Sequence, residues 1–118
     1  MMTRKEYLSA VEACEINDGR VGEVEKIYPK IPDLVKKMLS YSTDSIFFDD
    51  GYRTLSMAEI MDAEKDLHIN FAEKNMMPVA DCGENDFIVY HSDTGMWSKF
   101  NIVDESVFKR KNSLADLF

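Results

Sequence analysis

Few residues in this 118-residue chain have the type and spacing that catalysis or metal binding requires. His68 and His91 are the only histidines, and neither has two further ligands at a spacing typical of a metal site. The five glycines are scattered and form no phosphate-binding loop. The sequence therefore predicts neither a metal site nor a cofactor site.

The one arrangement with catalytic potential is a nucleophilic thiol paired with a base. Cys82 is expected at a strand end and His91 on the neighbouring strand, so His91 is a possible base. A thiol at the end of a buried strand is more often only a small apolar side chain. We therefore expect no catalytic residue, and we interpret the chain as a protein that is not an enzyme. Cys14 and Cys82 are expected to stay reduced.

Carboxylates are concentrated in the second half of the chain. Residues 44–105 contain 14 Asp and Glu against four Lys and Arg, and the whole chain carries a net charge of −8. Because no basic stripe is present, nucleic acid is a poor partner. Such a region would attract a basic protein partner by electrostatic steering. The alternative is that the acidic residues only keep the protein soluble. Pairs of carboxylates in turns are compatible with glycosidase catalysis or calcium binding. The EF-hand pattern is absent, however, and Asp is common in turns because its side chain forms local hydrogen bonds with the backbone.

Trp97 is the one tryptophan and a further candidate for partner binding. Trp97 lies in an alternating segment, so it faces either the core, which we favour, or a partner as an exposed hot spot. The candidate partner-binding residues, all in or beside predicted turns or on this segment, are Asp49, Asp50, Glu84, Asp86, Asp93 and Trp97.

Three strands joined by polar turns are predicted across residues 76–100. Residues 87–90, FIVY, lack polar alternation and are expected to form the central strand, buried on both faces. The turns are predicted at 82–86 and 92–95, and the third strand at 96–102. Upstream, Asp-Gly between residues 45–48 and 52–55 predicts a hairpin. Residues 106–111 are expected at the sheet edge, where three basic residues discourage pairing.

Helices are predicted before and between these strands. Thr3 with Glu6, and Ser56 with Glu59, have the form of capping boxes that open helices. The first helix is expected to end at residues 17–19, Asn-Asp-Gly. Further helices are predicted over residues 21–28, 32–41 and, at the end of the chain, 113–118. Residues 68–74 are either a loop or a short edge strand.

This order of elements predicts one α+β domain over residues 1–118, with an antiparallel sheet (a hairpin plus a meander) and helices packed against it. No segment approaches the roughly 20 apolar residues of a membrane span, and residues 1–8 lack the apolar core of a signal peptide. We expect a cytoplasmic protein without a membrane partner.

With its elements in this order, the chain resembles the SUKH superfamily of Smi/Knr-like domains over nearly its whole length. The stretches that carry the likeness are residues 31–34 (IPDL), 38–41 (MLSY), 55–60 (LSMAEI), 77–87 (MPVADCGENDF) and 112–118 (NSLADLF). Of these, residues 77–87 are the most similar, with a Pro-hydrophobic-Ala strand end and a Gly-bearing turn.

The resemblance implies a non-catalytic binding domain. It points to a bacterial immunity protein that binds and neutralises a polymorphic toxin, often a nuclease, whose basic cleft an acidic surface would fill. The alternative is a regulatory or scaffold module of the Smi/Knr kind that binds a housekeeping protein. The identity of the partner and the oligomeric state stay open at this point.

Overall fold

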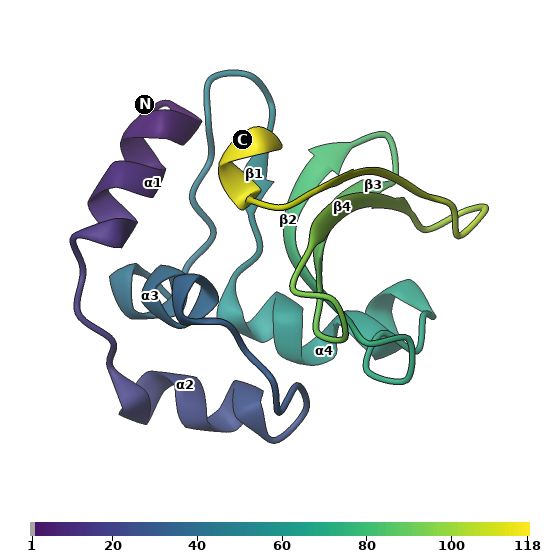
Figure 1. The fold of residues 1–118 in the computed structure, drawn as a ribbon, viewed down its shortest axis with the longest axis horizontal. Helices are drawn as coiled ribbons and strands as arrows, with labels where there is room; N and C mark the ends of the chain where they lie inside the picture. The colour runs from purple at the N-terminus through teal and green to yellow at the C-terminus, as the bar shows by residue number, and fades with distance from the viewer. Residues whose placement is uncertain (1) are drawn as a thin grey trace.

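The chain folds into a bundle of helices beside a curved antiparallel sheet (Figure 1). The computed structural model describes residues 2–118. The elements in chain order are α1 (Arg4–Glu12), α2 (Asp18–Glu25), α3 (Asp33–Tyr41), β1 (Arg53–Thr54), α4 (Met57–Leu67), β2 (Met76–Gly83), β3 (Asp86–His91), β4 (Trp97–Asn101), β5 (Val107–Lys111) and the 3-10 helix η1 (Leu114–Asp116).

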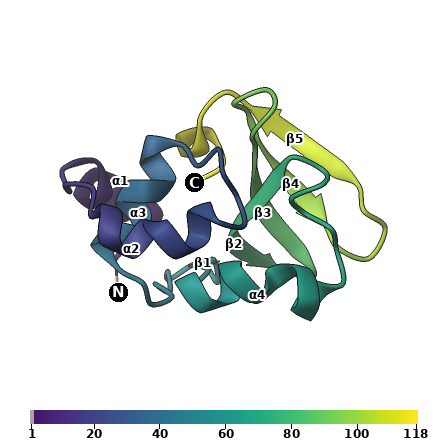
Figure 2. The same ribbon diagram turned by 90° about the horizontal axis from the view of Figure 1, so that it is seen from below.

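The sheet has the strand order β1-β2-β3-β4-β5, and all its strand pairs are antiparallel. The predicted α+β fold and the predicted meander are confirmed, and β3, which contains FIVY, is the central strand. Figure 2 shows α1, α2 and α3 together on one side of the sheet, while α4 runs beneath β2. Each helix thus has a neighbouring element against which its apolar side packs.

Both predicted capping boxes are present. The Thr3 hydroxyl accepts a hydrogen bond from the Glu6 amide at 3.1 Å, and Glu6 Oε1 accepts one from the Thr3 amide at 2.9 Å. Ser56 and Glu59 repeat this arrangement at the start of α4. These reciprocal bonds satisfy amides that no helical carbonyl reaches, so the two helices begin where the sequence predicts.

The predicted end of the first helix is wrong. Helix α1 ends at Glu12, and Asn17 starts α2, because its side-chain oxygen accepts a hydrogen bond from the Gly19 amide at 3.1 Å. Cys14 consequently lies in the connection between α1 and α2 and not within the first helix, where the predicted helix end would place it. An Asn-Asp-Gly sequence is compatible with both a helix end and a helix start, and here the capping bond decides.

The predicted hairpin is shorter than its sequence pattern. Its first arm makes only one bridge, from Phe47 to Arg53, and its second arm is the two-residue strand β1. The Ile46 amide donates to the Thr54 hydroxyl at 2.8 Å, so a side chain replaces one rung of the ladder.

Two other boundaries also move, and of the two alternatives for residues 68–74 the loop is the one that the structure shows. The turn predicted over residues 82–86 contains only Glu84 and Asn85, because β2 extends to Gly83 and β3 begins at Asp86. The predicted C-terminal helix is the single 3-10 turn η1, and residues 68–75 form turns and not an edge strand. Short elements have few hydrogen bonds of their own, so tertiary contacts set their ends.

The core joins the helices to the sheet. Tyr7 of α1 packs edge-on against Phe48, with ring centroids 5.4 Å apart, and Phe48 packs against Phe118 at 5.6 Å. On the opposite side of the sheet, Phe71 covers Phe100 at 5.8 Å. The central strand is therefore buried on both faces, as its lack of polar alternation predicts.

Candidate functional site

Three turns lie at the same end of the sheet. Pairing of Arg53 with Asp81 and of Asp86 with Asn101 places the hairpin turn at residues 49–51, the β2–β3 turn and the β4–β5 turn at that end. We call the carboxylates carried by these turns the acidic end; they are Asp49, Asp50, Glu84, Asp86, Asp104 and Glu105.

The β2–β3 turn is held in a tight left-handed conformation. Glu84 and Asn85 have φ values of 55° and 68°, as a two-residue hairpin turn of the right twist requires. The Asn85 carbonyl accepts a hydrogen bond from the Ile102 amide at 3.0 Å, which ties this turn to the β4–β5 turn. The Glu84 side chain is exposed and has no hydrogen bond or ion pair within residues 2–118.

The hairpin turn presents one engaged and one free carboxylate. Asp50 accepts hydrogen bonds from the Tyr52 amide at 3.1 Å and from Arg4 Nε at 2.6 Å. Desolvation alone would raise the pKa of Asp50, but these donors and the Arg4 charge together hold it below its ordinary value. Asp49 is exposed and has no such partner among the described residues.

The remaining carboxylates were predicted only in part. Asp86 is half-buried and accepts a hydrogen bond from the Asn101 side chain at 2.8 Å, so it is engaged within the fold. Asp104 and Glu105, between the segments predicted at 96–102 and 106–111, are not among the candidate residues predicted from the sequence. Hydrogen bonds from the side chain and the amide of Ser106 lower the pKa of Asp104, and Glu105 lies 3.3 Å from Lys74 Nζ. The clustering of Asn, Asp and Ser at residues 101–106 was the available signal for a turn.

Cations border the acidic end on its inner side. Arg4 stacks over the Tyr52 ring, with its guanidinium carbon 4.0 Å from the centroid, and donates to the Leu117 carbonyl at 2.9 Å. Lys99 Nζ donates to the Tyr52 hydroxyl at 2.6 Å. These contacts hold the end of the sheet to α1 and to the residue that follows η1. Asp49 and Glu84 take no part in them and are the exposed carboxylates of the acidic end without a hydrogen bond or ion pair among residues 2–118.

Two predicted site residues lie elsewhere. Asp93 is in the β3–β4 turn, roughly 20 Å from Glu84 along the strand direction. Trp97 is only 5 % exposed, and its ring centroid lies 4.9 Å from that of Tyr90. Of the two alternatives for Trp97, the core position is the one that the structure shows, and neither residue belongs to the acidic end.

The exposed aromatic residue at the acidic end is Phe47. Its side chain is 60 % exposed, two residues before Asp49, and the Arg53 guanidinium lies 5.9 Å from its ring centroid. Phe47 lies in the segment predicted as a strand and is not among the candidate partner-binding residues predicted from the sequence.

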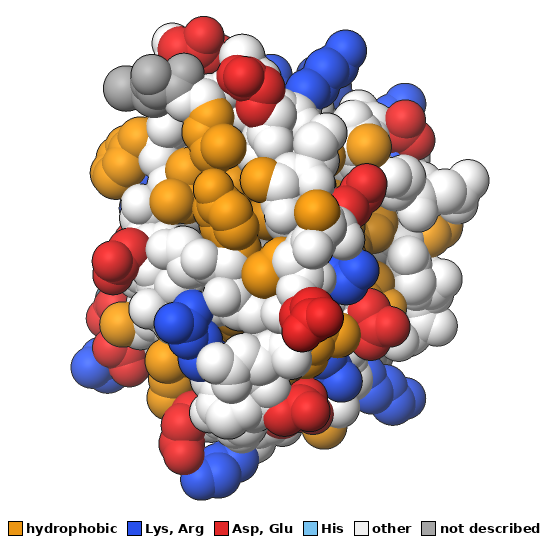
Figure 3. Space-filling model, turned by 90° about the vertical axis from the view of Figure 1, so that its left-hand side faces the viewer, with side chains coloured by type: hydrophobic (Ala, Val, Ile, Leu, Met, Phe, Trp, Pro, Cys, Tyr) orange, Lys and Arg blue, Asp and Glu red, His pale blue; other side chains and the backbone are white. Residues whose placement is uncertain are grey.

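A second group of apolar side chains lies on the helical side of the molecule. Figure 3 shows that side, where hydrophobic side chains gather in the upper half and acidic ones border them. Tyr41, at the end of α3, is 38 % exposed, but its ring packs on Tyr7 at 5.7 Å and its hydroxyl lies 3.9 Å from Met2 Sδ. Tyr41 is thus partly held by its own neighbours.

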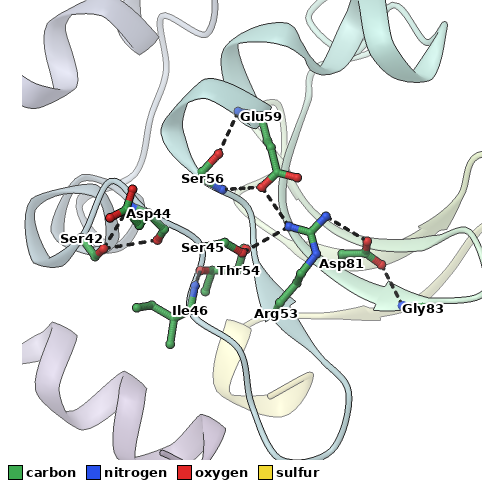
Figure 4. A network of polar contacts seen from close by, with 10 residues as sticks. All are labelled: Ser42, Asp44, Ser45, Ile46, Arg53, Thr54, Ser56, Glu59, Asp81 and Gly83. Atoms are coloured by element: carbon green, nitrogen blue, oxygen red, sulfur yellow. Dashed lines mark hydrogen bonds and ion pairs between the residues drawn. The ribbon is translucent and has the colours of Figure 1, made fainter. Parts of the chain in front are cut away.

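Figure 4 shows the polar network that holds β1, α4 and β2 together. Arg53 donates to Glu59 at 2.8 Å and to Asp81 at 3.3 Å, and it also contacts Ser45. The hydrogen bond from Arg53 and, to a smaller extent, the one from the Ser56 amide hold the pKa of Glu59 below its ordinary value. The hydrogen bonds of the Arg53 guanidinium all go to side chains of the fold itself, so the network is structural.

Cys82 and His91 do not form a nucleophile and base pair. The register pairs Met76 with His91 and places Cys82 at the opposite end of β2. Burial raises the pKa of the Cys82 thiol to about 11, which disfavours the thiolate. His91 is buried, with Nε2 2.5 Å from the Ser98 hydroxyl, and burial lowers its pKa.

Residues 2–118 contain neither a cluster of metal ligands nor a helix that could span a membrane. Within residues 2–118, no three His, Cys, Asp or Glu side chains gather in a way that would hold a metal ion. In the same part of the chain, none of the helices has the length and apolar character needed to cross a membrane.

Comparisons of the chain with protein-family models, with curated proteins and with solved structures gave no match.

Proposed function

We propose that this chain is a non-catalytic protein-binding domain whose acidic end binds a basic protein partner. The observation that carries the proposal is the convergence of three turns that present Asp49 and Glu84 as free carboxylates beside the exposed Phe47. An apolar aromatic anchor with charges at its border is typical of protein-binding hot spots.

The partner that fits this surface best is a basic toxin domain such as a nuclease, and the chain would act as its immunity protein. A nuclease carries a cationic cleft for phosphates, and carboxylates that fill the cleft compete with the substrate. The resemblance of residues 77–87 to SUKH domains agrees with this role and stays a prediction. Part of that stretch, from Glu84 to Asp86, also contributes carboxylates to the acidic end.

The direct test is to co-express the chain with the product of a toxin gene adjacent to its own gene. We expect a stable complex in a pull-down and restored growth of cells that make the toxin. If the chain neither binds nor restores growth, the immunity role is wrong. Binding to a housekeeping protein in place of the toxin would favour the regulatory Smi/Knr alternative.

A pair of aromatic substitutions tests the surface itself. Phe47→Ala is expected to weaken binding about tenfold or more, because an exposed aromatic anchor loses its contact area. Tyr41→Ala is the matched control on the helical side and is expected to leave affinity unchanged. Equal affinities of the two variants would contradict the assignment of Phe47.

A further inference from the structure

A cavity opens at the end of the sheet opposite to the acidic end. It has a volume of about 110 Å³ and lies between the segment that follows α2 and the beginning of β2. Its walls include Ile27, Tyr28, Met77 and Tyr90, and Lys30 and Asn75 are among the polar residues at its border. A closed cavity of roughly 150 Å³ lined by apolar side chains holds a whole benzene molecule. This space is smaller but open on one side, so it suits part of a single ring, with the substituent of the ring in the opening.

The hydroxyl of Tyr28, a residue of the cavity wall, is buried behind that wall. Tyr28 is 5 % exposed, and its hydroxyl is buried with no hydrogen bond among residues 2–118. Burial, and to a smaller extent the charge of Glu64, raise the pKa of Tyr28, so the hydroxyl keeps its proton. The carboxylate of Glu64 is already used, since it accepts the Ala72 amide at 3.1 Å. The hydroxyl therefore has no surface in the cavity, and Tyr28 offers a ligand only its ring.

The charge at the cavity is opposite to that of the molecule. Among the described residues that line the cavity, Lys30 alone is charged. Lys30 forms no ion pair within residues 2–118. The chain as a whole, by contrast, carries a net charge of −8. A free ammonium group at the mouth of an apolar space attracts an anion whose remaining part is apolar.

We propose that this cavity is a binding site for a small aromatic carboxylate, with the ring between Tyr28, Tyr90 and Met77 and the carboxylate toward Lys30. The site is independent of the proposed partner surface, because the two lie at opposite ends of β2 and β3. Either assignment can therefore fail without the other.

The probe for the test is benzoate, followed by amide chemical shifts of the isotope-labelled full chain. We expect saturable shifts centred on Ile27, Lys30, Met77 and Tyr90, with a Kd on the order of 1 mM or tighter. Benzylamine has the same ring with the opposite charge and is expected to give no saturable shifts. If benzoate gives none up to about 10 mM, or if benzylamine binds as well as benzoate, the proposal is overturned.

Two substitutions separate the roles of charge and space. Lys30→Met keeps the length of the side chain and removes its charge, so we expect about fivefold weaker benzoate binding. Ala72→Leu adds volume at the cavity wall and is expected to abolish the shifts, whereas Ala58→Leu, the same change at an exposed position of α4, keeps them. The amide spectra also show whether each variant is folded. Unchanged benzoate affinity in a folded Ala72→Leu variant would overturn the location of the site.

Discussion

At the scale of single residues, Arg53 is the one cation among residues 2–118 that forms ion pairs with two carboxylates. It joins the start of α4 to β2 through Glu59 and Asp81, and its own side chain is 24 % exposed. Because two carboxylates lose their common partner when Arg53 is removed, the cost exceeds that of one surface ion pair.

Arg53→Met is expected to lower the free energy of unfolding by about 1–2 kcal/mol. The matched control is Lys26→Met, which removes the exposed ion pair with Glu23 and is expected to cost measurably less. Urea unfolding followed by circular dichroism gives both values. If the two substitutions cost the same, the network does not hold β1 and α4 as described.

His91 is expected to make the stability of the fold depend on pH. Burial lowers its pKa in the folded chain from the ordinary value of 6.5. Below pH 6.5 the unfolded chain therefore binds a proton that the folded chain does not. The free energy of unfolding therefore decreases as the pH falls below 6.5, by up to about 1.4 kcal/mol per pH unit, until the pH reaches the pKa of His91 in the folded chain.

The measurement is the free energy of unfolding in urea between pH 8 and pH 5. His91→Gln is expected to remove the loss of stability that begins near pH 6.5. His68→Asn is the control at an exposed position, where Asn suits the left-handed backbone with φ 59°. A slope that persists unchanged in His91→Gln would contradict the assignment to His91.

At the scale of elements, the sequence predicts most reliably the segments that have their own signals. The two capping boxes and the apolar run of β3 agree with the structure because local hydrogen bonds and burial on both faces act there together. The first arm of the hairpin has the same apolar pattern as a strand, yet Thr54 takes the Ile46 amide and only one bridge forms. Side-chain competition of this kind is not visible in hydrophobic periodicity.

The β2–β3 turn gives the element-scale prediction. Asn85 has a φ of 68°, which Asn and Gly tolerate and β-branched residues do not. Asn85→Val is expected to lower the free energy of unfolding by about 1–2 kcal/mol, whereas Asn85→Gly leaves it nearly unchanged or raises it. Asn70→Val, at an exposed position without positive φ, is the control in the same urea experiment. Equal stabilities of the Val and Gly variants at residue 85 would contradict the turn geometry.

At the scale of the whole molecule, the strand pairing of the sheet decides which of the acidic residues lie close together on the surface. The sequence shows that residues 44–105 are acidic, but it does not show that the turns near Asp49 and Glu84 lie at one end and that of Asp93 at the other. Alternation along residues 96–102 leaves both faces open for Trp97, and the favoured core position is the one that the structure shows, whereas the exposed aromatic residue near the turns is Phe47. Long-range pairing decides both positions.

The central claim is that the acidic end binds a basic protein partner, and a charge-reversal pair tests it most directly. Asp49→Lys with Glu84→Lys reverses two free carboxylates at the acidic end. Asp62→Lys with Asp93→Lys makes the same change of net charge on α4 and at the other end of the sheet. The affinity of each double variant for the protein partner found in the pull-down is measured by calorimetry. We predict at least about a tenfold loss for the first variant and little change for the second. Equal affinities of the two variants would contradict the account.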